Sequence, residues 1–225
     1  MRHPLSTVFA ISLLSASLVA ALGQSEKQKS FEAAASEERG CVTIPYSELQ
    51  SQCVDQQKGV NEACNGRNGP VKCTLQVTES LKGRIVTTER RTEELKRERQ
   101  ELDSQRDHAN DQGQKDRIKE QIDEKDKQIE ASNRQSEDLK RALSDRKDQI
   151  DKTIDRINQC ISYRQAVMNI FETSLDKVRN DGDRDAELRP SAEKLKTKYQ
   201  GEKETHKGEI DGKARAIDDC KAERP

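Results

Sequence analysis

The chain reads IKEQIDEKDKQIEASNRQSEDLKRALSDRKDQI over residues 118–150, in the middle of a charged stretch that runs from Val77 to Val178. Isolated Leu and Ile residues interrupt the Glu, Lys, Arg, Asp and Gln of this stretch, many of them at intervals of seven. A spacing of seven keeps apolar side chains on one face of a helix, where they pack against another helix. The stretch therefore predicts long helices that pair along a narrow apolar seam.

The predicted seam widens toward its carboxyl end, because a second line of apolar residues joins the first from Ile150 onward. A wider apolar stripe indicates packing against more than one surface. The seam consists of Leu81, Leu95, Leu102, Ile122, Ile129, Leu143, Ile150, Ile154, Ile157, Ile161, Met168, Phe171, Leu175 and Val178.

The composition excludes a conventional globule with a wide core. Hydrophobic residues make up 31% of the chain and charged residues 37%, with 3% aromatic residues and no Trp. Such a polar chain could instead be disordered. The periodic seam and the near-absence of Pro and Gly between Arg84 and Asp181 favour helices. The formal net charge of -1 gives no field of one sign, so we expect no nucleic-acid partner.

Two breaks divide the stretch. The period fails near residues 109–114, where Asn110 and Gly113 indicate a reversal between antiparallel helices, or at least a discontinuity. Acidic and glycine residues indicate a second turn at 181–190, and a last helix is predicted over residues 191–225. We expect this last helix to be less stable, with frayed stretches, because it contains Gly201, Gly208 and Gly212.

The first residues are typical of a secretory signal peptide, which we assign to residues 1–23. A membrane anchor is the alternative, but the apolar run is short and no basic stop-transfer cluster follows it. We therefore expect a secreted protein, periplasmic or extracellular, with no membrane span after cleavage. Residues 24–40 are polar and small, which predicts a flexible lead or a weak helix.

Residues 41–76 contain fewer charged residues and four of the six cysteines, and they are predicted to form a small cystine-rich head. A short helix is expected over 45–64, a turn over 65–70, and either a strand or the start of the next helix over 71–77. An even number of cysteines in an exported chain favours disulfides over metal ligands. The six candidates are Cys41, Cys53, Cys64, Cys73, Cys160 and Cys220.

Several disulfide pairings are compatible with the sequence. A fold-back at the turn favours nested bridges, Cys41–Cys73 and Cys53–Cys64, while sequential bridges Cys41–Cys53 and Cys64–Cys73 are the alternative. If the last helix folds back at residues 181–190, Cys160 and Cys220 face each other, which predicts a third bridge.

No motif predicts catalysis, a cofactor or a metal site. Asp181, Asp183 and Asp185 resemble the start of a calcium loop, but the required Gly and Glu are missing, so we interpret them as a solvated turn. His108 and His206 have no second histidine at metal-binding spacing and are interpreted as surface residues. We expect a protein that is not an enzyme.

The sequence thus predicts an all-α fold of elongated antiparallel coiled-coil hairpins with a small disulfide-stapled N-terminal head. This architecture suits an exported structural or interaction protein that acts as a spacer or scaffold for a protein partner. The alternatives are an exported holdase-type chaperone, or a regulator that docks onto an envelope enzyme. The apolar seam can be buried against another helix of the same chain or against a helix of a second chain, so a homo-oligomer is possible.

Overall fold

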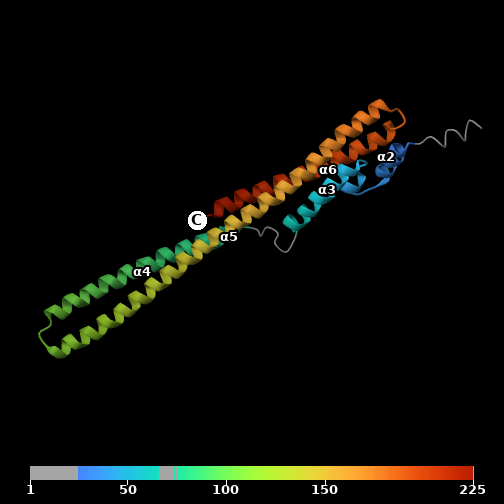
Figure 1. Cartoon of the computed structure of the whole chain (residues 1–225). Coiled ribbons are helices and arrows are strands. Elements are labelled where there is room, and N and C mark those ends of the chain that lie inside the picture. The colour runs from blue at the N-terminus through green and yellow to red at the C-terminus, as the bar shows by residue number, and fades with distance from the viewer. Residues whose placement is uncertain (1–24, 66–72, 74, 225) are drawn as a thin grey trace, which may run out of the picture. The chain divides into compact units, whose positions relative to one another are not determined.

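The structure is a computed structural model that describes residues 25–65, 73 and 75–224. Within these residues the chain is all-helical without a strand, so the predicted all-α class is confirmed. None of the described helices combines the length and hydrophobicity needed to cross a lipid bilayer. The elements are α2 (Glu26–Ser36), η1 (Gly40–Thr43), α3 (Ser47–Val60), η2 (Asn61–Asn65), α4 (Leu75–His108), α5 (Gln112–Arg184) and α6 (Arg189–Glu223) (Figure 1).

The chain divides into two compact units. Unit 1 comprises residues 1–69 and 159–213, and unit 2 comprises residues 70–158 and 214–225. The long helices α5 and α6 contribute residues to both units. The predicted signal peptide and most of the predicted turn at 65–70 lie outside the described residues.

In unit 2, α4 lies beside the first part of α5 and runs antiparallel to it (Figure 1). The chain reverses after His108, within the segment where the sequence predicts a break. Asp111 begins the second helix, because its carboxylate accepts a hydrogen bond from the Gln114 amide at 3.1 Å. Next to the reversal, Ala109, Ile118 and Ile122 form a small apolar cluster.

The predicted seam residues are all buried or partly buried, and Leu95, Ile122, Ile150 and Ile157 are among the fully buried ones. Polar residues are also buried between α4 and α5 in unit 2. Thr92 and Ser132 are buried opposite each other and share a hydrogen bond of 2.7 Å. These hydroxyls pair across the helices and satisfy each other without water.

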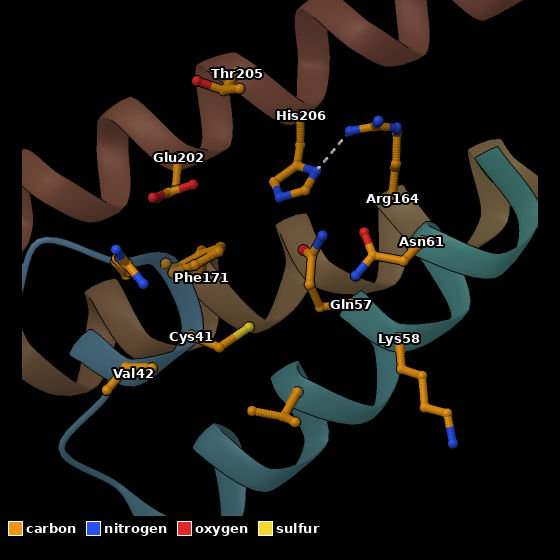
Figure 2. Close-up of a pocket in the computed structure, with 13 residues that line it drawn as sticks. Cys41, Val42, Gln57, Lys58, Asn61, Arg164, Phe171, Glu202, Thr205 and His206 are labelled. Atoms are coloured by element: carbon orange, nitrogen blue, oxygen red, sulfur yellow. Dashed lines mark hydrogen bonds between the residues drawn. The ribbon is translucent and has the colours of Figure 1, made fainter. Parts of the chain in front are cut away.

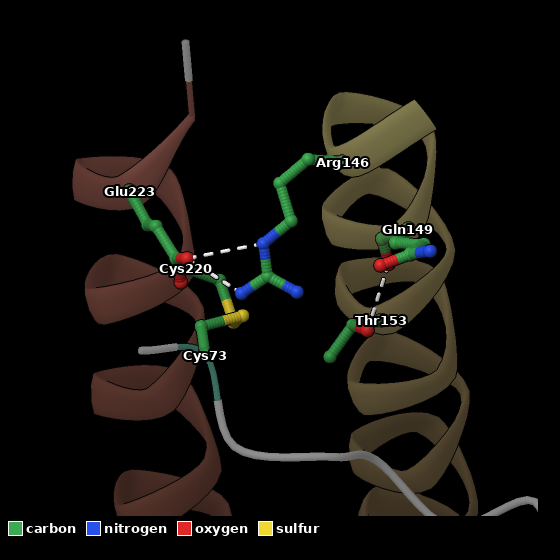
Figure 3. Close-up of a disulfide and its surroundings, with 6 residues drawn as sticks. All are labelled: Cys73, Arg146, Gln149, Thr153, Cys220 and Glu223. Atoms are coloured by element: carbon green, nitrogen blue, oxygen red, sulfur yellow. Dashed lines mark hydrogen bonds and ion pairs between the residues drawn. A yellow bond between two sulfur atoms is a disulfide. The ribbon is translucent and has the colours of Figure 1, made fainter. Parts of the chain in front are cut away.

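The carboxyl end of α6 is fastened within unit 2 by a disulfide and an ion pair (Figure 3). Cys220 bonds to Cys73, and the Glu223 carboxylate, which is fully buried, accepts hydrogen bonds from Arg146 Nε and Nη2 at 3.1 and 2.5 Å. The second oxygen of Glu223 is buried without a hydrogen-bond partner. Among the described residues, Arg146 is therefore the one cation that pairs with this buried carboxylate.

In unit 1, the core gathers side chains from α2, η1, α3, α5 and α6. Phe31 of α2 is 1% exposed and packs edge-on against Tyr46 with ring centroids 6.0 Å apart. Tyr199 of α6 is completely buried and donates its hydroxyl proton to the Thr43 carbonyl at 2.5 Å. Residues 24–40, interpreted as a flexible lead or weak helix, therefore contain an ordered helix whose apolar face belongs to the core.

The second reversal is shorter than predicted. Helix α5 continues to Arg184 and α6 begins at Arg189, so much of the predicted 181–190 turn is helical. Leu188 in the connection is buried, which anchors it to the unit 1 core. The expected fraying of the last helix is also wrong, since α6 is continuous through its three glycines. Tertiary burial of one face outweighs their low propensity.

All six candidate cysteines form disulfides, but most of the predicted pairings are wrong. The bridges are Cys41–Cys53, Cys64–Cys160 and Cys73–Cys220, so only Cys41–Cys53 of the sequential alternative is present. Within residues 41–76, Cys64 is therefore bonded to Cys160 of α5, and Cys73 is bonded to Cys220 of α6.

The predicted Cys160–Cys220 bridge fails because of the helix register. Arg164 of α5 lies opposite His206 and Glu209 of α6. At this register, the position opposite Cys160 lies about two helical turns before Cys220. Cys160 is therefore free to pair with Cys64 instead.

Close helix packing in unit 1 predicts the effect of adding a methyl group at Gly59. A Cβ atom there would lie 2.4 Å from the ring of Tyr163, whereas one at Gly201 would meet nothing within 4 Å. We expect Gly59→Ala to lower the free energy of unfolding by about 1–3 kcal/mol. The matched control Gly201→Ala should raise it by about 0.5–1 kcal/mol. Urea denaturation followed by circular dichroism measures both, and equal effects would contradict the packing.

The ion pair between Arg146 and Glu223 predicts that substitutions of these two residues have non-additive effects on stability. Arg146→Met should destabilise the fold by about 3 kcal/mol, because it leaves the buried Glu223 carboxylate unpaired. Adding Glu223→Met should restore most of this loss. Lys96→Met, which removes an exposed pair with Glu93, should leave stability nearly unchanged. A double-mutant cycle in urea tests this, and simple additivity would refute it.

Candidate functional site

A cavity of about 600 Å³ opens in unit 1 and is the candidate functional site (Figure 2). Five elements, η1, α3, η2, α5 and α6, and the segment before η1 line it. Its lining residues are Arg39, Gly40, Cys41, Val42, Val54, Gln57, Lys58, Asn61, Arg164, Phe171, Glu202, Thr205 and His206.

The cavity exists because a short segment is fixed against a helix. The Cys41–Cys53 disulfide joins η1 to α3, with a Cα–Cα distance of 5.5 Å. Gly40 precedes this cysteine with φ of 32°, in the left-handed region that favours glycine. The Thr43 hydroxyl donates back to the Gly40 carbonyl at 2.8 Å, which closes the short helix. The backbone conformation at Gly40 and the Cys41–Cys53 disulfide thus fix η1 in place as one wall of the cavity.

His206 of α6 is buried, being 5% exposed, and its ring stacks on Phe171 at 6.3 Å between centroids. Burial, followed by the nearby Arg164 cation, lowers the pKa of His206 from its ordinary value of 6.5, while Glu209 acts weakly in the other direction. The interpretation of His206 as a surface residue is therefore wrong. His108, by contrast, is exposed, and its Nδ1 lies 2.6 Å from the Ser104 carbonyl oxygen.

Arg164 of α5 is the buried cation of the cavity, since its side chain is 11% exposed. Its Nη1 lies 3.5 Å from His206 Nδ1, and its Nη2 lies 3.5 Å from the Glu209 carboxylate. Its Nε is buried and has no hydrogen-bond partner. The guanidinium group is thus held by long contacts and has unused donor capacity.

The opposite part of the cavity is apolar. Val42 and Val54 are 49% and 51% exposed, and both line it. The other exposed large hydrophobic residues among those described, Val77 and Val86, belong to α4 in unit 2. In the described part of unit 1, the large exposed apolar side chains are therefore concentrated at this cavity.

A second polar cluster in unit 1 contains Asp181, near the end of α5, whereas Asp183 and Asp185 are exposed. Asp181 accepts a hydrogen bond from the Tyr46 hydroxyl at 2.9 Å and pairs with Lys27 at 2.9 Å. Burial, followed by the bond to Asp181, raises the pKa of Tyr46. Among the described residues no cluster of three potential metal ligands occurs. Asp181 fastens α2 and the start of α3 to α5, rather than lying in a solvated turn.

The sequence-derived residues contribute only in part to the cavity. Cys41 and the seam residue Phe171 line it, whereas the other seam residues do not. Arg164 and His206 were missed as site residues. The sequence does contain a signal that His206 is buried. Tyr199, His206 and Cys220 are separated by multiples of seven residues, which places them on one face of α6. Nothing in the local sequence distinguishes Arg164 from the many exposed arginines.

Comparison of the chain with models of known protein families, with curated proteins and with solved structures finds no match.

The buried histidine predicts a pH dependence of stability. Because folding lowers the pKa of His206, the unfolded chain binds this proton more readily, and stability is lost as the pH falls below about 6.5. The urea midpoint should therefore drop between about pH 7.5 and about pH 5.5, and drop less in His206→Gln. The exposed-histidine control His108→Gln should behave like the wild type. An identical drop in all three proteins would contradict this effect. The charged groups nearest His206 are Arg164 and Glu209, with Lys58, Arg39 and Glu202 also lining the cavity.

Proposed function

We propose that this protein is an exported structural or interaction protein whose helices form elongated antiparallel coiled-coil hairpins and act as a spacer or scaffold. The observation that carries the proposal is the construction of unit 2. There, a long helix pair buries a narrow seam and leaves most of its other side chains polar and exposed. Such a pair can hold its two ends at a fixed distance without a wide core.

Cross-helix ion pairs support this reading of unit 2. Lys125 pairs with Glu98 at 2.5 Å, and Lys140 pairs with Glu89 at 2.7 Å. Each exposed pair contributes little to stability, but charges flanking a seam favour one partner orientation and register. The pairs are consistent with an antiparallel coiled coil formed within one chain.

Export is supported by the cysteines. All six are joined in three disulfides, and such bonds persist mainly in oxidising compartments outside the cytosol. The N-terminal sequence of residues 1–23, which has the pattern of a signal peptide, agrees with this proposal.

The burial of the wide part of the seam favours a scaffold over a holdase chaperone. A holdase must present apolar surfaces to unfolded clients. The seam residues from Ile154 to Val178 are instead buried or partly buried. The large hydrophobic residues that are exposed in the described part of the chain are four separate valines.

A lengthened helix pair tests the spacer role. Duplicating residues 91–104 and 120–133 inserts two heptads into each helix and repeats Leu95, Leu102, Ile122 and Ile129 of the seam. Small-angle X-ray scattering should show a maximum dimension larger by about 20 Å, since each helical residue adds about 1.5 Å. In a strain that lacks the gene for this protein, the lengthened protein should fail to restore the wild-type phenotype. A spacer of the wrong length cannot position its partner.

A matched control keeps the length and changes the surface. Exchanging the charges within Glu98–Lys125 and Glu89–Lys140 preserves both ion pairs and should restore the phenotype. A variant lacking residues 2–23 should fail, because it is not exported. An unchanged maximum dimension, or full function of the lengthened protein, would overturn the spacer proposal.

A further inference from the structure

The cavity of unit 1 has two chemically different sides. Figure 2 shows a group of polar side chains from α3, η2, α5 and α6, and to one side of it a group of apolar side chains near which Glu202 also lies. The polar group consists of Gln57, Asn61, Arg164 and His206. The apolar group includes Cys41, Val42 and Phe171. An amphipathic ligand matches such a division better than a uniformly polar or apolar one does.

One hydrogen-bond donor on the polar side is unused, because Arg164 Nε is buried without an acceptor. A buried donor without a partner is costly, and an acceptor placed beside it would recover that cost. Arg164 can only donate, so in its contact with His206 the Nδ1 atom accepts, and the ring proton on Nε2 is then available to a ligand as a second donor.

The charge of the lining favours an anionic acceptor. Arg39, Lys58 and Arg164 supply three positive charges, and Glu202 supplies one negative charge. A carboxylate matches a guanidinium group well, because its two oxygens can accept parallel hydrogen bonds. The partly buried position of Arg164 strengthens this attraction relative to that of an exposed arginine.

The exposed valines indicate what the rest of the ligand is. Val42 and Val54 are about half exposed, directly follow Cys41 and Cys53 in the sequence, and both line the cavity. Covering this wall with a hydrocarbon group removes apolar surface from water, which stabilises the complex. The cavity volume of about 600 Å³ lies within the range usual for small-molecule sites.

We propose that the cavity binds a small organic monocarboxylate with an aliphatic body. The carboxylate accepts hydrogen bonds from Arg164 and from the His206 ring, and the hydrocarbon chain covers the valine wall. The proposal is independent of the spacer role, because every residue it uses belongs to unit 1.

Titration calorimetry on the full-length oxidised protein tests this site, with octanoate as the probe and octanamide as its neutral analogue. Octanoate should bind saturably, and octanamide should bind at least about 10-fold more weakly because it lacks the charge. Val42→Asp places a negative charge on the exposed wall without disturbing the core and should weaken octanoate binding by at least about 10-fold.

The matched control is Val86→Asp, which makes the same change at a valine that is 55% exposed in α4, away from the cavity. It should leave octanoate binding unchanged. Absence of saturable binding up to about 5 mM octanoate would overturn the proposal. So would equal affinity for octanamide, or equal binding by Val42→Asp and the wild type.

Discussion

The apolar stripe of α5 is the interaction on which the rest of the structure depends. With 31% hydrophobic residues, the chain can bury only narrow surfaces. A single helix of 73 residues supplies one stripe to both units. In unit 2 it faces α4, and in unit 1 it contributes Val167, Phe171 and Val178 to a core shared with shorter segments. Because burial of this stripe supplies much of the hydrophobic free energy, the other helices fold as its partners.

The disulfides convert weak local segments into parts of a stable fold. Cys64 is 96 residues from Cys160, and Cys73 is 147 residues from Cys220. Closing loops of this length restricts the unfolded chain by several kcal/mol each, on the order of 5. Helix α3 is only 14 residues long. It is anchored to η1 by the Cys41–Cys53 bridge and to α5 by the Cys64–Cys160 bridge that follows it. Isolated helices of that length are marginal in water.

The short segments of unit 1 create the chemically distinctive site. Long paired helices offer a solvated surface with little depth, whereas η1 and α3 cover α5 and α6 and leave a hollow among them. This hollow buries a histidine and nearly buries an arginine, which no exposed helix face would do. The proposed spacer role and the cavity thus belong to different units and different packing geometries.

The sequence by itself determined the helical class, the apolar seam, the break after His108 and the oxidation of all six cysteines. Each of these follows from local chemistry: a seven-residue spacing, a cluster of Asn, Asp and Gly, and an even cysteine count in a chain with a signal-like start. Only the tertiary structure decided the disulfide partners, the helix over residues 26–36 and the burial of His206. Pairing depends on the register between helices, and a shift of two turns moved Cys220 away from Cys160 without changing any local pattern. Burial of a single residue likewise depends on which distant segment covers it, and Phe31, Arg164 and His206 are covered by segments far away in the sequence.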